Sequence, residues 1–289
     1  MSIYNMDIMN GKNGKRLLRK ALLAAPFVLL ALGGLDLLLE YRTVRVHEYV
    51  IEDTDIPKAF SGYRIAFLTD IHYGPYFLKA RMEALVRQVN GLKPDLVLMG
   101  GDYVHMDPQY IQPCFQGLGG IKAVDGVYGV LGNHDHWEGA VACRREMQVN
   151  HLGLLDNRAF WLTRGRDRIK IGGVGDLSSD IQVLDPTIRD ATEDDFVLLV
   201  SHNPDYAERI KTRKVDLMLA GHTHGGQVTV FGLYAPLLPT TTGQKYRSGL
   251  VQGPLCKVIV SNGIGVITPP VRFFAPPEIV VVELRGLVL

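Results

Sequence analysis

Short apolar runs that stop abruptly at polar residues are the feature that most restricts the fold of this chain. The run DLVLMGGD, from Asp95 to Asp102, is apolar without alternation, which is typical of a parallel strand covered on both faces. Comparable runs occupy residues 63–70, 126–133, 168–176, 195–204, 216–227, 257–265 and 278–286.

Helical patterns lie between some of these runs. Apolar residues recur at spacings of four, three, four and three from Leu78 to Leu92, which predicts an amphipathic helix. A second helix is expected over residues 138–150. Strands that alternate with helices and then follow one another more closely predict an α/β fold with two packed sheets.

Five of the predicted strands end in residues that bind metal ions well: Asp70 and His72, Asp102, Asn133 and His134, His202, and His222 and His224. Functional groups gather at the carboxyl ends of strands in α/β sheets, so we expect these five ends to converge. Side chains two residues apart on an extended segment point to the same side, so a pair such as Asp70 and His72 can hold one ion. Oxygen and nitrogen ligands without thiolate favour Mn, Fe or Zn.

Each of these strand ends has an ordinary structural explanation when it is taken alone. An Asp after a strand commonly caps a turn, a buried His commonly hydrogen-bonds within a core, and Asn133 tolerates a left-handed turn. However, most of the nine histidines lie in or beside these motifs. Capping does not explain five separate ends of this kind, and the sequence therefore predicts a metal centre.

The order of the motifs D-x-H, G-G-D, G-N-H-D, a His before N-P, and G-H-x-H resembles that of the calcineurin-like metallophosphoesterases. The resemblance covers residues 63–227 by motif. It implies a four-layer α/β/β/α sandwich with two divalent metal ions at the strand ends, Mn being expected ahead of Fe or Zn. It also implies hydrolysis of a phosphodiester or pyrophosphate bond through attack by a hydroxide that bridges the two metals.

The family pattern assigns a role to each motif residue. It implies a first metal held by Asp70, His72 and His224, a second held by Asn133, His202 and His222, and a bridge through Asp102. His134 is then the residue that assists the leaving group or stabilises the attacked phosphate. Every motif position carries a competent side chain, so an active enzyme is expected.

The stretches GHTHGGQ, SHNPD and GVGD, together with the N-terminal segment, resemble the membrane-associated bacterial branch of this family. Some members of that branch act on the pyrophosphate of UDP-2,3-diacylglucosamine in lipid A biosynthesis, whereas others are described only as phosphodiesterases. The resemblance thus implies a phosphoester substrate, with a lipid-linked one among the candidates. Two alternatives stay open: a membrane-tethered metal-binding protein without turnover, and a nuclease with the same centre.

The N-terminal region differs in charge from the rest of the chain. Residues 1–20 carry five bases and one acid, and the remaining residues carry 26 bases and 29 acids. A slightly acidic body argues against nucleic-acid binding, which requires a basic surface. The charge-free run Ala21–Leu35 after the basic cluster favours a retained membrane anchor over a signal peptide or a buried helix.

We therefore expect an anchor within residues 1–45 and a metallophosphoesterase domain in residues 46–289. The expected location is the bacterial cytoplasmic membrane, and the sequence leaves open which face carries the domain.

Other residues near the motifs have more than one interpretation. Asp135 either orients an imidazole or caps the following turn, and His136 and Trp137 are expected at the rim or in packing. The loop 236–249 is a candidate functional loop. Late bases are candidates for binding a second phosphate, although solvated surface bases are the commoner case: Lys245, Arg247 and Arg272. The cysteines are widely spaced, which predicts buried or incidental thiols: Cys114, Cys143 and Cys256.

Overall fold

The computed structural model describes residues 20, 23, 34 and 40–287, and it contains two six-stranded sheets. The first sheet has the order β1-β12-β2-β3-β4-β5, and the second has the order β10-β11-β9-β8-β7-β6. The strands of the first sheet are β1 (Arg45–Asp53), β2 (Tyr63–Leu68), β3 (Leu96–Met99), β4 (Val127–Gly129), β5 (Gly153–Leu154) and β12 (Glu278–Gly286). Those of the second are β6 (Arg158–Arg164), β7 (Asp167–Gly173), β8 (Val197–Val200), β9 (Leu217–Ala220), β10 (Gly249–Gln252) and β11 (Lys257–Val260). The predicted α/β fold with two packed sheets is confirmed.

The helices are shorter and less regular on the second sheet than on the first. The α-helices are α2 (Lys79–Gly91), α3 (Ile111–Leu118), α4 (Asn133–Val149) and α5 (Asp185–Ile188). The 3-10 helices are η1 (Glu40–Arg42), η2 (Lys58–Phe60), η3 (Pro108–Tyr110), η4 (Pro204–Arg209), η5 (His224–Gly226) and η6 (Gly243–Tyr246).

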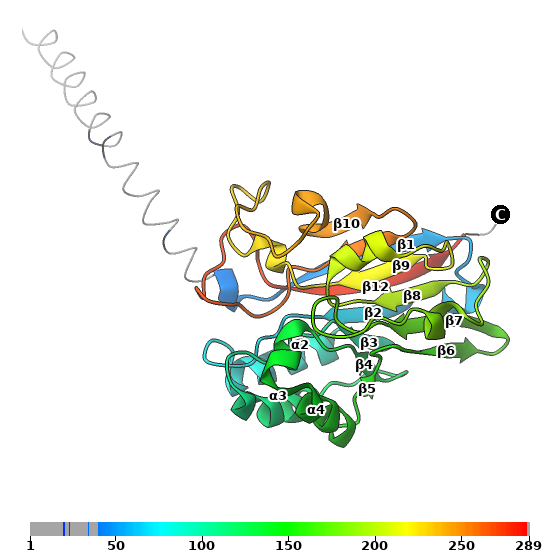
Figure 1. Ribbon diagram of the computed structural model, residues 1–289, viewed down its shortest axis with the longest axis horizontal. Coiled ribbons are helices and arrows are strands. Elements are labelled where there is room, and N and C mark those ends of the chain that lie inside the picture. Colours follow the sequence, from blue (N-terminus) through cyan, green and yellow to red (C-terminus); the bar gives the residue numbers. More distant parts are fainter. Residues whose placement is uncertain (1–19, 21–22, 24–33, 35–39, 288–289) are drawn as a thin grey trace, which may run out of the picture.

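Three apolar clusters hold these layers together. One cluster joins the first sheet to α2, α3 and α4, which lie together on one side of that sheet (Figure 1). A second cluster fills the space between the two sheets. The third lies on the outer face of the second sheet, where it is covered by residues of η4 and α5 and by loops. The outer layer on this side therefore consists of short helices.

Parallel pairing brings the ends of several strands to one edge. In the first sheet, β2, β3 and β4 run parallel, and in the second sheet β7, β8, β9 and β11 do. The strands β2, β3, β8 and β9 are almost completely buried, as expected for parallel strands covered on both faces. Their carboxyl ends meet where the two sheets pack, and the polar motifs follow there.

Two elements differ from the expectation. Helix α4 begins at Asn133 rather than near residue 138, because the carboxylate of Asp135 accepts the backbone N–H of Gly132 and caps the first turn (2.9 Å). A kink at Gly139 (φ 140°) separates this first turn from the rest of the helix. Strand β1 carries no apolar run because most of its side chains are exposed, yet it pairs with β12 along nine residues.

The predicted membrane anchor lies almost entirely outside the described residues, and so does most of the proposed N-terminal region. Within residues 20, 23, 34 and 40–287, no helix has both the length and the apolar character needed to span a bilayer. The three cysteines are free and buried, as predicted.

Candidate metal centre

All eight strand-end residues come together at the edge where the sheets meet. Asp70 and His72 follow β2, and Asp102 follows β3. Asn133 and His134 open helix α4 after β4, His202 follows β8, and His222 and His224 follow β9. All of these side chains are buried except those of His134 and His222, which are partly exposed. The five strand ends therefore converge, as expected from the sequence.

A first group of metal-ligand type consists of Asp70, His72 and His224. The Nε2 atoms of His72 and His224 lie 3.0 Å apart. Oδ1 of Asp70 lies 3.6 Å from Nε2 of His224. These are the three residues that the family pattern assigns to the first metal.

A second group consists of Asp102, His202 and His222, with Asn133 beside it. Nε2 of His202 lies 3.1 Å from both Oδ1 of Asn133 and Nδ1 of His222. It also lies 3.3 Å from Oδ2 of Asp102. The same Oδ2 atom is 3.6 Å from Nε2 of His72. The carboxylate of Asp102 therefore lies between the two groups.

The backbone at these strand ends is strained. Five of the seven predicted ligands have left-handed φ angles between 48° and 69°: Asp70, His72, Asp102, His222 and His224. Residues other than glycine rarely adopt this conformation, and such residues cluster at functional sites. Space is also tight, because a Cβ on Gly132 would lie 2.2 Å from Oδ1 of Asp102. The fold thus holds the carboxylate and imidazole groups in place at an energetic cost.

Three of the four proposed histidine ligands are neutral and suit metal binding, whereas His202 must release a proton before it can bind an ion. Burial lowers the pKa of His72 and His224 well below the usual range and that of His222 to about 4, so these rings are neutral and offer lone pairs. Burial alone would also lower the pKa of His202, but the adjacent carboxylate of Asp102 raises it to about 10. Conversely, burial favours protonation of Asp102, yet His202 holds the pKa of that carboxyl well below its usual range.

The donor set fits divalent cations. Nitrogen and oxygen ligands that share an ion at about 2.1 Å lie roughly 3.0 to 3.4 Å from each other, which is close to the spacing of both groups. The buried Nδ1 of His72 has no hydrogen-bond partner among the described residues. Two neutral imidazoles whose Nε2 atoms face each other can share only one hydrogen. A cation between the two Nε2 atoms would satisfy both of them.

His134 stands beside the ligand groups, and a further histidine accompanies it. Its backbone N–H donates to Oδ1 of Asp102 (2.8 Å), and its ring lies against His72 and Trp137, with centroid distances of 4.7 and 4.6 Å. Nδ1 of His105 lies 3.4 Å from Nδ1 of His134. His105 was missed by sequence reasoning because it lies in a loop after β3, and its one signal is its position three residues after Asp102.

Asp135 acts as a cap for backbone groups. Its carboxylate accepts the N–H groups of Asp102 and Tyr103 at 2.8 Å as well as that of Gly132. Of the two roles open to it, the structure shows capping. Asp135 thereby fixes the loop that carries Asp102 to the loop that carries Asn133.

Arg272 is not a surface base, and that expectation was wrong for this residue. It is completely buried and donates to the backbone carbonyls of Gly265 and Ala275 at 2.7 and 2.8 Å. Its guanidinium also lies 3.3 Å from Nδ1 of His224. The proline-rich loop around Arg272 folds inward behind His224, which the sequence does not reveal. Lys245, by contrast, is exposed and pairs with Glu208 (2.6 Å).

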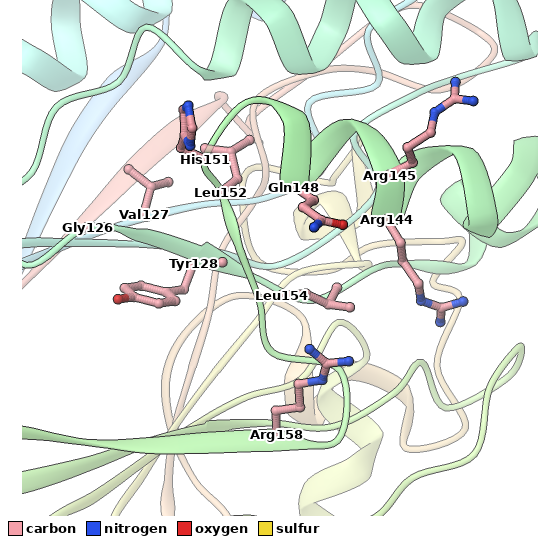
Figure 2. Close-up of a pocket in the computed structure, with 11 residues that line it drawn as sticks. Gly126, Val127, Tyr128, Arg144, Arg145, Gln148, His151, Leu152, Leu154 and Arg158 are labelled. Atoms are coloured by element: carbon pink, nitrogen blue, oxygen red, sulfur yellow. The ribbon is translucent and has the colours of Figure 1, made fainter.

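A large cavity lies away from this centre. It has a volume of about 840 Å³ and lies beside the first residues of β4, β5 and β6. Figure 2 shows Arg144 and Arg158 at this cavity, and none of the strand-end groups lines it. Arg144 pairs with Asp156 and Asp180 at 3.1 and 2.9 Å. Together with His136, those two carboxylates form another group that could hold a metal ion. However, the guanidinium of Arg144 already supplies positive charge there.

Comparison with known proteins identifies the family. The family model for calcineurin-like phosphoesterases matches residues 63–226. The chain therefore belongs to the calcineurin-like phosphoesterases, and it is a metal-dependent hydrolase. The resemblance found in the sequence motifs is confirmed at this level.

Individual relatives agree with the family. YkuE of Bacillus subtilis, an uncharacterized metallophosphoesterase, is 29% identical over 285 residues, which cover 94% of this chain and 99% of the relative. A "transmembrane protein with metallophosphoesterase domain" of Danio rerio is 27% identical over 243 residues, 80% of this chain and 55% of that protein. The structure of Haemophilus influenzae NAD nucleotidase is similar in fold, with a TM-score of 0.50 and 14% identity over 70% of this chain and 50% of that one.

Proposed function

We propose that this protein hydrolyses a phosphodiester or pyrophosphate bond in a lipid-linked substrate at the bacterial cytoplasmic membrane. One observation supports the proposed hydrolysis. Two groups of ligand-type residues are arranged around the carboxylate of Asp102. One ion needs four to six ligands, and seven ligand-type side chains exceed that number. Two divalent ions, Mn ahead of Fe or Zn, fit the nitrogen and oxygen donors.

In this proposal each group of residues holds one ion, with Asp70, His72 and His224 around the first and Asn133, His202 and His222 around the second. Two bound cations would activate a water molecule and offset the charge of the phosphate. The neutral amide of Asn133 limits the negative charge of the centre. Asp102 contributes to both sites and orients His134 through the backbone N–H that it accepts.

His134 is the proposed proton donor. It is partly exposed at the edge of the centre, next to the ligands, so its ring can reach a leaving group. A protonated imidazole is chemically suited to donate a proton to a leaving group. His105 lies next to this ring and helps to hold it in position.

The proposal of a lipid-linked substrate rests on other observations. The sequence before residue 40 has a basic cluster followed by an apolar run, and a relative is named a transmembrane protein. UDP-2,3-diacylglucosamine, from lipid A biosynthesis, is the specific candidate because its pyrophosphate is attached to a lipid. A membrane-bound enzyme gains access to such a substrate without extracting it into water.

The proposal is tested by incubating the purified full-length protein with Mn²⁺ and a panel of substrates. The panel contains bis(p-nitrophenyl) phosphate, UDP-2,3-diacylglucosamine in vesicles, and single-stranded DNA. We expect hydrolysis of the first two and none of the DNA. Cleavage of DNA alone would support a nuclease, and two tightly bound metals without any hydrolysis would support a metal-binding protein.

A further inference from the structure

A cluster of exposed apolar side chains borders the metal centre. Between residues 228 and 237, the exposed fractions reach 74% for Phe231, 82% for Leu233 and 84% for Leu237, and Phe274 from a separate loop is 41% exposed. We call residues 228–239 together with Phe274 the apolar lobe. Solvated surfaces rarely gather so many large apolar side chains in so few residues, and such patches mark interaction sites.

The apolar lobe is held rigidly in its exposed position. Arg247 donates to the carbonyl of Gly232 (2.7 Å), and Gln244 exchanges hydrogen bonds with the backbone of Ala235 (3.0 and 2.8 Å). The rings of Phe231 and Phe274 contact each other with centroids 5.7 Å apart. Both residues have left-handed backbone, with φ angles of 53° and 52°, which is strained for bulky side chains. The fold therefore keeps these rings exposed instead of burying them.

A groove lined partly by the apolar lobe reaches one of the proposed metal ligands. It has a volume of about 460 Å³, and His224, one of the proposed ligands, lies on its wall. Most of the remaining wall is apolar, including Val228, Leu238 and Ile267. A hydrocarbon chain bound there would place a phosphate attached to it close to the ligand groups. The chemistry of the groove thus matches a lipid phosphoester.

The helix η1 lies at the same end of the structure as the apolar lobe. In Figure 1, η1 and the gold loop that contains residues 228–239 both lie at the left-hand end of the molecule. The backbone N–H of Arg45 donates to the carbonyl of Pro277 (2.8 Å), three residues after Phe274. The apolar run Ala21–Leu35 ends five residues before Glu40, the first residue of η1. A membrane reached by that run is therefore close to the apolar lobe.

We propose that the apolar lobe inserts into a lipid bilayer, so that a lipid phosphoester reaches the metal centre along the groove. The insertion stands on the exposed side chains and on the position of η1, whereas delivery of the substrate rests on the proposed function. Aromatic and aliphatic side chains at a protein edge are typical of structures that enter the boundary between headgroups and hydrocarbon.

Insertion is measured directly with the full-length protein reconstituted in phosphatidylethanolamine and phosphatidylglycerol vesicles. A tryptophan is introduced by Phe231→Trp and, as the matched control, by Val141→Trp on α4, where the native side chain is 82% exposed. Brominated lipids should quench the fluorescence of Phe231→Trp well beyond that of the wild type. They should quench the fluorescence of Val141→Trp no more than that of the wild type. Equal quenching of both variants would overturn insertion, whatever the protein hydrolyses.

Delivery of the substrate is measured with Leu233→Asp, and Val141→Asp again serves as the control, because both native side chains are 82% exposed. Relative to the wild type, Leu233→Asp should lower kcat/KM for UDP-2,3-diacylglucosamine in vesicles about tenfold more than that for bis(p-nitrophenyl) phosphate. The control should lower neither. Equal losses on both substrates would show a purely structural role for the lobe. Hydrolysis of neither substrate by the wild type would refute the proposed function but leave the quenching result valid.

Discussion

Acidic residues lie at the amino ends of β3 and β9 and after the carboxyl ends of β2 and β3, and the two ends use them differently. At the amino ends, Asp95 and Asp216 accept backbone N–H groups of neighbouring strands, those of Arg64 at 2.8 Å and Val197 at 2.7 Å. At the carboxyl ends, Asp70 and Asp102 also accept backbone N–H groups, but each faces histidine rings as well. The amino-end acids extend the sheets, whereas the carboxyl-end acids form the metal centre.

Backbone conformation separates the two ends as well. Asp70 and Asp102 have φ angles of 53° and 55°, and neither Asp95 nor Asp216 has a positive φ. Strain of this kind persists only where the surrounding structure enforces it. The size of a cavity is a poorer guide, since the arginine-lined cavity in Figure 2 is larger than the groove beside the centre. Convergent ligand atoms on strained backbone locate the site.

The strongest test of the difference between the two strand ends replaces one acidic residue at the carboxyl end and one at the amino end. Asp102→Asn should lower turnover by more than about 100-fold and release at least one metal, because it removes the negative charge shared by both groups. Asp95→Asn should leave activity and metal content near those of the wild type. Metal analysis and hydrolysis of bis(p-nitrophenyl) phosphate measure both. Two tightly held ions and full activity in Asp102→Asn would refute the bridging role.

The next test concerns the proposed proton donor. His134→Ala should lower turnover by roughly 10²–10⁴-fold and leave the metal content nearly unchanged. The loss should be smaller for a nitrophenyl ester than for an alkyl or lipid ester, because nitrophenolate leaves without protonation. The exposed His151, changed to Asn, is the control for removal of an imidazole. Equal losses on both esters would favour stabilisation of the phosphate, and loss of metal would make His134 a ligand.

A smaller effect is expected at His105. His105→Ala should lower kcat by about tenfold with little change in KM, because His105 acts by positioning His134. His105→Asn should restore part of the activity, since an amide can hydrogen-bond to the imidazole. His72, His105 and His134 also form a group of metal-ligand type. Loss of metal from His105→Ala would therefore assign His105 to the centre as a ligand.

The sequence was sufficient for the parts of the fold and site that depend on residue type and local pattern. The buried strand β3 follows from its apolar run, and Asp102 follows from its place after that run. Strand β1 was missed because its exposed side chains give no apolar run, and its pairing with β12 is formed by residues far apart in the chain. Long-range packing, which sequence patterns do not contain, decides such cases.

The same reason explains the errors at individual residues. Arg272 lies in a loop rich in proline, which is typical of an exposed segment, yet that loop packs behind His224. Asp135 could not be assigned because its partners, Asp102 and Tyr103, lie more than thirty residues earlier in the chain. The strained φ angles of the ligands are likewise a property of the assembled edge.

The last test concerns stability at the amino ends. Burial raises the pKa of Asp216 to about 7, well above the ordinary range of an aspartate, so the fold prefers the protonated carboxyl. Asp216 therefore favours the folded state most below pH 4, and this contribution is lost as the pH rises to about 7. The free energy of unfolding of Asp216→Asn should accordingly exceed that of the wild type at pH 8, by about 1–3 kcal/mol. The asparagine oxygen can still accept the N–H of Val197.

The difference between Asp216→Asn and the wild type should disappear near pH 4, where the wild-type carboxyl is protonated in the folded state. Urea denaturation of both proteins at a series of pH values measures it. Asp190→Asn provides a control of opposite sign, because hydrogen bonds from Lys170 and Trp161 lower the pKa of Asp190 to about 2. Its carboxylate stabilises the fold above pH 4, and that contribution is lost as the pH falls towards 2. If Asp216→Asn destabilised the protein equally at every pH, its hydrogen bond to Val197 would outweigh its charge, and the amino-end acids would be purely structural acceptors.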